Sequence, residues 1–276
     1  MTVPCEGQDL VAATAIFGDR LPLAQRYVEH LATTGIERGL IGPREVPRLW
    51  ARHVLNCAAV QEYIAEGASV ADVGSGAGLP GLCLAIARPD LAITLIEPLE
   101  RRVIWLHEVV EDLGLENVKI LRSRAEQAVG QVDADVVTAR AVSALVGLVD
   151  ITLPILRGTG ELLALKGRSA REEIKKAKKK LNRYGARETE ILTAGEGLER
   201  LAGEDHAVPA PSSPPIHAPR PPRRAPAARP AAAKPNVPAV PPKEVRMPPP
   251  LTSAPTAAQK DDAPPEENQP HFEVRV

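Results

Sequence analysis

Residues 69–81, SVADVGSGAGLPG, constrain the fold of this chain most strongly, because a short apolar run ends at Asp72 and breaks into four closely spaced glycines. Glycine adopts positive φ at little steric cost and lets a ligand approach bare backbone. A helix that begins near Leu79 would point its free amides and the positive end of its dipole at the same place. We therefore expect a strand, a glycine loop and a helix that together hold a charged cofactor.

The glycines fit two motifs, and each motif favours a different cofactor. In Asp-x-Gly-x-Gly-x-Gly the first glycine follows the strand directly, as Gly74 does. In Gly-x-Gly-x-x-Gly, which begins here at Gly76, the loop satisfies the dinucleotide fingerprint. An NAD(P)-dependent oxidoreductase is therefore an alternative, although the glycines of such enzymes usually begin directly after the strand.

Proline content separates a foldable region from a tail, because 20 of the 28 prolines lie between Pro209 and Pro270. A segment rich in Pro, Ala and Arg buries too little apolar surface to fold. We expect an N-terminal helical segment over residues 1–67, a cofactor-binding domain over 68–205 and a disordered tail over 206–276. Residues 271–276 alternate like a strand, but we expect them to lie outside the sheet and its edge to be incomplete. A shift of reading frame after Leu192 is a second explanation of the tail.

Hydrophobic periodicity predicts an α/β fold with a doubly wound, mostly parallel sheet that is preceded by helices. The expected N-terminal helices cover residues 9–17, 21–31 and 45–64. The expected strands cover 69–73, 92–96, 118–121, 134–139, 161–165 and 187–192. Between them we expect helices at 79–87, 99–113, 144–156, with a kink at Pro154, and 171–184. In such a sheet the ligand lies beyond the carboxyl ends of the strands.

Charged side chains follow three of the predicted strands. Glu97 comes 23 residues after Gly74, near the spacing at which an acid accepts hydrogen bonds from the ribose hydroxyls of a cofactor. Arg140 and Lys166 follow the fourth and fifth strands. Asp72, one residue inside its strand, is expected to aim at the loop or at the cationic part of a ligand. Cys83 falls on the apolar side of its helix and is expected in the core.

Two groups of basic residues are candidates for contact with a nucleic acid. Between Lys166 and Arg187 the sequence contains ten Lys or Arg residues and two acids. This charge is enough to neutralise several phosphates of a nucleic acid. A helix face that only contacts solvent is an equal alternative. Arg48, Arg52 and His53 form a second basic group.

The three cysteines have no paired spacing and no apolar run is long enough to span a membrane. We expect a cytoplasmic monomer without a metal ion.

The glycine loop together with Glu97 resembles the Class I S-adenosylmethionine-dependent methyltransferases. Five strings extend the likeness: the loop continued through Leu79-Pro80-Gly81, Arg52-His53-Val54-Leu55-Asn56, Ser123-Arg124-Ala125-Glu126, Arg140-Ala141 and Leu165-Lys166-Gly167. Together they resemble the ribosomal RNA small subunit methyltransferase G family, also called glucose-inhibited division protein B. The likeness spans roughly residues 10–195.

The resemblance implies transfer of a methyl group from S-adenosylmethionine to N7 of a guanine in 16S ribosomal RNA. The expected cofactor contacts are Asp72, Gly74, Ser75, Gly76, Gly78, Leu79, Glu97, Ala125, Glu126 and Arg140, with Ala125 and Glu126 at the adenine. The expected RNA contacts are Arg52, His53, Arg124, Lys175, Lys176 and Lys179. Arg140 and Lys166 are the expected catalytic residues, and one of them is expected to hold the guanine through O6.

The expected chemistry requires no general base, because guanine N7 already offers a lone pair to the sulfonium methyl group. Proximity and orientation alone can lower such a barrier by roughly 7 to 11 kcal/mol. The second alternative is a non-catalytic RNA-binding protein on the same fold, against which the intact glycine loop and Glu97 count.

Overall fold

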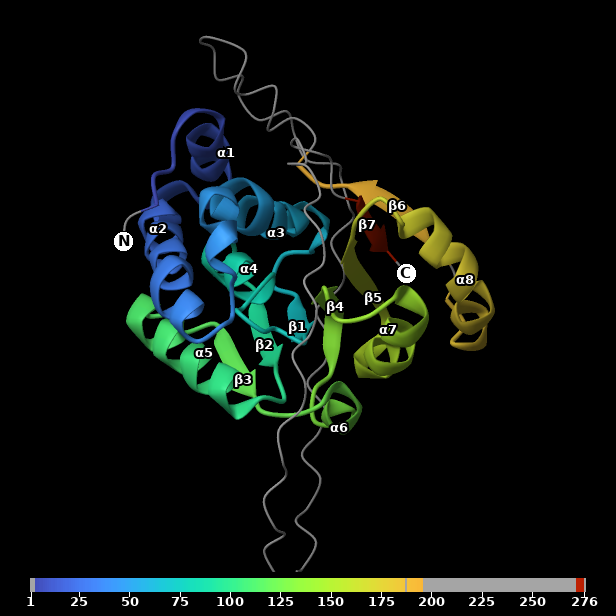
Figure 1. Ribbon diagram of the computed structural model, residues 1–276. Coiled ribbons are helices and arrows are strands. Elements are labelled where there is room, and N and C mark those ends of the chain that lie inside the picture. The colour runs from blue at the N-terminus through green and yellow to red at the C-terminus, as the bar shows by residue number, and fades with distance from the viewer. Residues whose placement is uncertain (1–2, 187, 196–271, 276) are drawn as a thin grey trace, which may run out of the picture. The chain divides into compact units, whose positions relative to one another are not determined.

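The computed structural model describes residues 3–186, 188–195 and 272–275, and its centre is a seven-stranded sheet of order β3-β2-β1-β4-β5-β7-β6 (Figure 1). The strands are β1 Ser69–Val73, β2 Ala92–Ile96, β3 Val118–Leu121, β4 Ala134–Arg140, β5 Leu156–Lys166, β6 Glu190–Thr193 and β7 Phe272–Arg275. Strands β1 to β5 are parallel, whereas β7 is antiparallel to both β5 and β6. The predicted doubly wound, mostly parallel sheet is confirmed.

Strand β7 corrects the prediction for the end of the chain. It lies between β5 and β6, and Glu273 is paired with Leu165 on one side and Leu192 on the other. The expectation that residues 271–276 lie outside an incomplete sheet is therefore wrong for Phe272–Arg275. The entropy of loop closure grows only slowly with length, by about 0.6 kcal/mol per doubling, so a long connection does not prevent such pairing. The rest of the predicted tail lies outside the described residues.

Helices cover both faces of the sheet (Figure 1). One apolar cluster joins α1 Gly7–Phe17, α2 Leu21–His30, α3 Asn56–Ala59, α4 Gly81–Ala87 and α5 Glu100–Leu113 to one face. A second cluster joins α6 Ala125–Ala128, α7 Leu145–Thr152 and α8 Ala170–Arg183 to the other. Cys83 is fully buried in the first cluster, as predicted. No helix in the described part of the chain is long and apolar enough to cross a membrane.

Prolines account for two differences from the predicted helices. The expected helix over 45–64 is divided into the 3₁₀ segment η3 Pro43–Arg48, the π-helical turn η4 Leu49–Leu55, α3 and the 3₁₀ segment η5 Val60–Tyr63. Pro47 lies inside η3 and has no N–H to donate to the Pro43 carbonyl, so the turn that begins at Pro43 lacks this α-helical bond. Pro154 ends α7 instead of kinking it, because η6 Leu153–Ile155 leads directly into β5.

Other boundaries also differ from the sequence-based expectation, and β6 begins at Glu190 instead of residue 187. Helix α4 begins at Gly81, not at residue 79, and β5 begins at Leu156 because an irregular register lets the strand continue through Gly158 and Gly160. The short helix α6 was not predicted. The remaining helical turns are η1 Gly18–Arg20 and η2 Leu31–Gly35.

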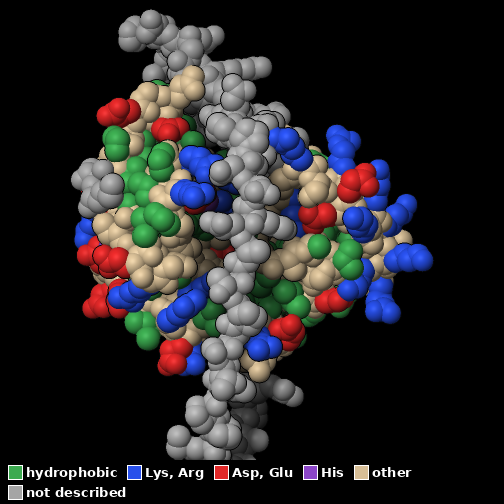
Figure 2. Space-filling view, in the orientation of Figure 1, with side chains coloured by type: hydrophobic (Ala, Val, Ile, Leu, Met, Phe, Trp, Pro, Cys, Tyr) green, Lys and Arg blue, Asp and Glu red, His purple; other side chains and the backbone are tan. Residues whose placement is uncertain are grey.

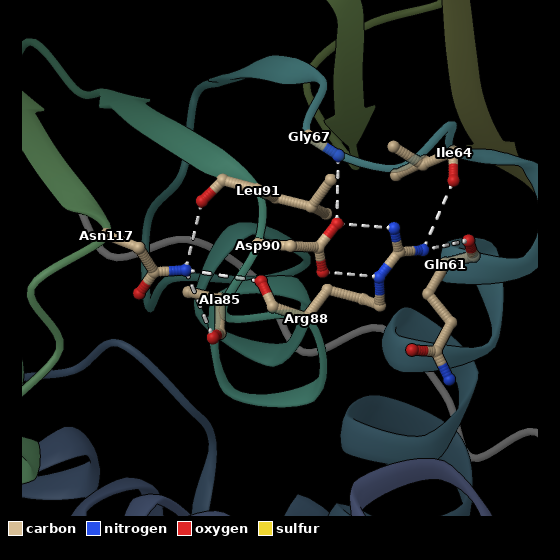
Figure 3. Close-up of polar contacts among 8 residues, drawn as sticks. All are labelled: Gln61, Ile64, Gly67, Ala85, Arg88, Asp90, Leu91 and Asn117. Atoms are coloured by element: carbon tan, nitrogen blue, oxygen red, sulfur yellow. Dashed lines mark hydrogen bonds and ion pairs between the residues drawn. The ribbon is translucent and has the colours of Figure 1, made fainter. Parts of the chain in front are cut away.

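A polar network fixes the amino end of β2, away from the glycine loop (Figure 3). Arg88 makes two 2.7 Å bonds to the Asp90 carboxylate and also donates to the carbonyl oxygens of Gln61 and Ile64. Asp90 accepts from the Gly67 amide at 3.0 Å. The network therefore joins the end of the N-terminal helices to the segment between α4 and β2.

Candidate active site

The glycine loop connects β1 to α4 in a conformation that its glycines make possible. Gly74, Gly76 and Gly78 have φ values of 72°, 57° and 83°. A Cβ atom on Gly78 would lie 2.4 Å from Leu82 Cδ1, and one on Gly74 would lie 2.8 Å from Val142 Cγ2. The loop is anchored to the end of β2, because the Gly74 amide donates to the Ile96 carbonyl at 2.9 Å. Backbone strain excludes side chains at all three glycines, and lack of space excludes them at Gly74 and Gly78 as well.

Asp72 supports this loop from inside the protein. Its side chain is fully buried, with Oδ2 accepting from the Gly81 amide at 3.1 Å and Oδ1 accepting from Thr138 Oγ1 at 3.2 Å. Burial raises the pKa of Asp72 to about 6, against the opposing effect of these hydrogen bonds. The carboxyl group therefore links β1 to the start of α4 and to β4, as the expectation that it aims at the loop requires.

Glu97 follows β2 and is also buried, with 1% of its surface exposed. Its Oε2 accepts from the Gly76 amide at 3.0 Å, and its Oε1 accepts from the Leu99 amide at 2.9 Å. The acid thus lies against the glycine loop, as its spacing from Gly74 predicts.

Arg102 is a neighbour of Glu97 that sequence reasoning missed. Its Nη1 lies 3.5 Å from Glu97 Oε2, and a Cβ on Gly76 would lie 3.9 Å from the same nitrogen. Within the part of the chain that the structure describes, Arg102 Nε is the one buried side-chain nitrogen or oxygen without a hydrogen-bond partner. The sequence feature that could have indicated it is a basic residue in the first turn of α5, the helix that follows Glu97.

The segment after β3 occupies the same edge of the sheet, because β3 is the parallel neighbour of β2. Ala125, which is buried, and Glu126, which is exposed, begin helix α6. Arg124 precedes them and is exposed. The structure therefore brings the expected adenine contacts to the edge that carries Glu97.

Arg140, at the end of β4, is held by the N-terminal segment. Its Nη2 lies 2.7 Å from His53 Nδ1 and 3.4 Å from the Arg52 carbonyl oxygen, and its Nη1 donates to Cys57 Sγ at 3.0 Å. His53 Nε2 lies 2.7 Å from Glu45 Oε2. Burial alone would raise the pKa of the Cys57 thiol, but its bonds with Cys83 and with Arg140 lower it. Both ring nitrogens of His53, an expected RNA contact, are engaged inside the protein.

Lys166, at the end of β5, anchors the loop that follows Arg140. Its ammonium group donates to the Ser143 carbonyl at 2.6 Å and lies 3.0 Å from the Glu173 carboxylate. Glu173 in turn accepts from the Leu145 amide, the first of α7, at 2.7 Å. Ala141 in this loop has φ 55°, a conformation that is strained for a residue other than glycine. The expectation that Arg140 or Lys166 holds the target base stays a prediction.

Helix α8 has one packed face and one basic face. Ala177 and Leu181 are buried against the sheet, whereas Lys175, Lys176 and Lys179 are exposed. Figure 2 shows Lys and Arg side chains gathered over α8 at the right of the view. Lys180 instead forms an ion pair with Asp150 and donates to the Val146 carbonyl at 2.9 Å. One face of α8 therefore packs on the sheet, while the three exposed lysines and Lys178, which is also exposed, lie on the other.

The residues present fit S-adenosylmethionine. The glycine loop, in which Gly74 and Gly76 are partly exposed, suits a cofactor that carries a carboxylate and a cationic sulfur. The buried Glu97 offers acceptors to a ribose diol, and the unpartnered Nε of Arg102 adds a donor beside it. The sheet with its inserted antiparallel β7, the glycine loop and the buried acid define a Class I S-adenosylmethionine-dependent methyltransferase.

Comparison with known proteins identifies the family. The family model described as rRNA small subunit methyltransferase G (GidB) matches residues 20–202. The protein of that name from Pseudarthrobacter chlorophenolicus is 70% identical over 190 residues, which cover 69% of this chain and 88% of the relative. The one from Thermobifida fusca is 54% identical over 186 residues, which cover 67% and 78%. The chain belongs to this family and is an S-adenosylmethionine-dependent methyltransferase of small-subunit ribosomal RNA, which decides against both alternatives.

Precorrin-6y C5,15-methyltransferase from Geobacter metallireducens aligns with a TM-score of 0.41 and 15% identity over 56% of this chain and 79% of its own.

Proposed function

We propose that the protein methylates N7 of a guanine in 16S ribosomal RNA. The observation that carries this proposal is the state of the two carboxyl groups beside the glycine loop. Asp72 and Glu97 are both buried and accept hydrogen bonds from backbone amides, so neither is placed to remove a proton from an acceptor. Guanine N7 has a free lone pair and needs no such base.

The cysteines support the same acceptor. Methylation of a pyrimidine at C5 requires a thiol that attacks the ring. Cys57 and Cys83 lie near the site but are fully buried, and Cys57 Sγ accepts from Arg140 at 3.0 Å. Neither thiol can reach a base without rearrangement of the core.

The cofactor supplies an electrophilic methyl group on a sulfonium centre. We infer that the loop residues Gly74, Ser75, Gly76, Gly78 and Leu79 surround its methionine part. Glu97 would accept from the ribose hydroxyls, and Arg102, which lies beside Glu97, would donate to the same oxygens. Ala125 and Glu126 would border the adenine, and Arg140 would border both the cofactor and the base. Asp72 would act indirectly, by supporting the loop.

Basic side chains on both sides of the strand ends would bind the RNA backbone. Lys175, Lys176 and Lys179 are exposed on α8, and Arg124 is exposed after β3. Arg52 lies near Arg140, which contacts its backbone. Replacing the three lysines by glutamine should weaken RNA binding and reduce the salt slope by roughly 0.7 to 0.9 per lost phosphate contact. Lys119→Gln, on an exposed position of β3, is the matched control and should leave the slope unchanged.

Methyl transfer to RNA with modified guanines tests the acceptor. The wild-type protein, labelled S-adenosylmethionine and 16S RNA should give 7-methylguanosine after nuclease digestion, with isolated RNA and whole small subunits assayed in parallel. RNA transcribed with 7-deazaguanosine, in which N7 is replaced by C–H, should accept no label. Label in the 7-deaza RNA, or in another nucleoside, would refute the proposal.

The proposal also describes a monomer that acts in the cytoplasm without a metal ion. The rate of methyl transfer should be unchanged by a chelator, and light scattering should give the mass of one chain. A rate that is lost with chelator and restored by a divalent cation would contradict this part.

A further inference from the structure

His53 lies between the Glu45 carboxylate and the Arg140 guanidinium, and these two partners determine which of its ring nitrogens carries a proton. Its Nε2 is 2.7 Å from Glu45 Oε2, and its Nδ1 is 2.7 Å from Arg140 Nη2. An ionised carboxylate only accepts hydrogen bonds, and a guanidinium only donates them. Both contacts are therefore satisfied when Nε2 carries the hydrogen and Nδ1 is bare. This state is the neutral imidazole in one defined tautomer.

We propose that His53 is a positioning residue for methyl transfer: the neutral ring, oriented by Glu45, holds the Arg140 guanidinium at the carboxyl end of β4, and a doubly protonated ring would release it. The inference rests on the proposed function, because it assigns Arg140 to the methyl-transfer site. It deepens that function by making the N-terminal segment part of the site.

His53 makes a close contact with the Arg140 guanidinium, 2.7 Å from Nδ1 to Nη2. The same Nη2 lies 3.4 Å from the Arg52 carbonyl oxygen, and Nη1 donates to Cys57 Sγ at 3.0 Å. His53 has 8% of its surface exposed and lies in the π-helical turn η4, so its ring has little freedom to follow a displaced partner. Irregular turns of this kind often occur at functional sites.

A shift of Arg140 would reach the cofactor loop through two residues. Ala141 follows Arg140 directly and has φ 55°. The next residue, Val142, fills the space that a Cβ on Gly74 would need, since its Cγ2 would lie 2.8 Å from that atom. The contact chain therefore runs from Glu45 through His53 and Arg140 to the glycine loop.

The surrounding charges favour the neutral ring. Burial lowers the pKa of His53, and the nearby Arg140 and Arg52 add to this effect, while Glu45 opposes it. The other charged and titratable groups that face the His53–Arg140 pair come from five elements: Glu45 of η3, Arg52 of η4, Cys57 of α3, Cys83 of α4 and Tyr27 of α2. A second proton on the ring would set an N–H against the guanidinium, so the rate should fall on the acid side.

Two substitutions of His53 separate its two contacts. Asn places an acceptor near the position of Nδ1 and keeps the contact with Arg140, whereas Gln places its amide near Nε2 and keeps only the contact with Glu45. His53→Gln should lower kcat by about 10²-fold, as expected for a displaced group in a preorganised site. His53→Asn should restore much of that loss and should abolish the acid fall in rate. His107→Gln, at an exposed position on α5, is the control and should keep the wild-type pH profile.

Nitrogen-15 NMR of the protein without cofactor provides a readout independent of activity. The ring of His53 should show a protonated Nε2 and a bare Nδ1, and Glu45→Gln should shift its titration and the acid limb of the rate to lower pH. The positioning role of His53 is refuted if the other tautomer is found, or if the Asn and Gln variants lose the same activity and keep the wild-type pH profile. Failure of the wild-type protein to methylate RNA would instead refute the proposed function. The tautomer found by NMR would still test the contact between His53 and Arg140.

Discussion

The Gly81 amide donates a hydrogen bond to the Asp72 carboxylate at 3.1 Å, and this contact closes the loop that the two residues flank. Asp72 is the penultimate residue of β1, and Gly81 is the first residue of α4. A Cβ on Gly81 would lie 2.7 Å from Asp72 Oδ2, so the close approach requires glycine. The strand, the loop and the helix are thus held together by a buried carboxyl group that the cofactor does not need to touch.

Replacement of Asp72 should separate hydrogen bonding from charge. Asp72→Ala leaves the Gly81 amide and the Thr138 hydroxyl without their partner and should cost about 1–3 kcal/mol of unfolding free energy for each buried group left unpaired. Asp72→Asn can still accept from Gly81 and can donate to Thr138, so it should be at least as stable as the wild type at pH 7. Urea denaturation measures both. An Asn variant as unstable as the Ala variant would contradict this assignment.

The pH dependence of the same pair follows from the raised pKa of Asp72, about 6 against an ordinary 3.8. The folded state binds this proton more tightly than the unfolded state. Protonation of Asp72 therefore stabilises the folded protein below pH 4, and this contribution is lost as the pH rises through 6. The Asn variant does not titrate here. Its stability relative to the wild type should therefore rise across this window, and a constant difference would show that burial does not set the pKa.

Gly78→Ala should damage the loop more than a glycine replacement that meets only backbone strain. Both Gly78 and Gly67 have positive φ, at 83° and 69°, but only the Cβ on Gly78 would meet a neighbour, Leu82 Cδ1 at 2.4 Å. The Gly67→Ala variant is therefore the matched control for strain. Calorimetry with S-adenosylhomocysteine should show binding lost in Gly78→Ala and retained in Gly67→Ala. Equal binding by the two variants would mean that the loop tolerates the clash.

Glu97→Gln should weaken cofactor binding without unfolding the protein. The two carboxylate oxygens accept from the Gly76 and Leu99 amides, and an amide side chain offers only one acceptor oxygen. Loss of the hydrogen bond from a ribose hydroxyl to Glu97 should remove about 1–3 kcal/mol of binding free energy, which is roughly 5- to 150-fold weaker binding of S-adenosylhomocysteine. Glu100→Gln removes an acid from the same segment that pairs with Arg122 at the surface and should bind normally. Equal affinities in the two variants would remove Glu97 from the cofactor site.

Asp90→Asn should lower stability at neutral pH and lose that effect in acid. The bonds from Arg88 hold the pKa of Asp90 at about 2, below its ordinary 3.8. The stabilisation is thus present above pH 4 and is lost as the pH falls towards 2. At pH 7 the variant should lose up to about 1 kcal/mol, the usual contribution of an exposed ion pair, because Asp90 lies at the surface. Asp133→Asn, which removes an exposed carboxylate 3.9 Å from Arg157, is the control and should have little effect.

The central sheet was predictable because its signals are local. Each of β1, β2 and β3 has the bounds that its short apolar run predicts, and Glu97 lies against the loop because parallel strands end at one edge. Positive φ at Gly74, Gly76 and Gly78 likewise follows from the residue type. The start of β5 was missed because Gly158 and Gly160 are typical of a loop, whereas here they lie in an irregular part of the strand.

The contacts that depend on distant segments were not predictable. His53 and Arg140 are 87 residues apart, and neither side chain carries a mark of its partner in a single sequence. Asp72 was expected at the loop, but its bond to Thr138 requires the pairing of β1 with β4. Strand β7 was rejected for its distance from the sheet, although the pairing of a strand depends on a free edge and not on the length of the connection.

The place of β7 also sets an order of events during synthesis. Strand β6 pairs with β7 and not with β5, so among the described residues the sheet partner of residues 190–193 is 272–275, which is synthesised later. The glycine loop, Glu97 and Arg140 belong to strands that can pair much earlier. A ribosome making this protein would therefore carry a nascent chain whose cofactor-binding strands are complete while its sheet is still open at one edge.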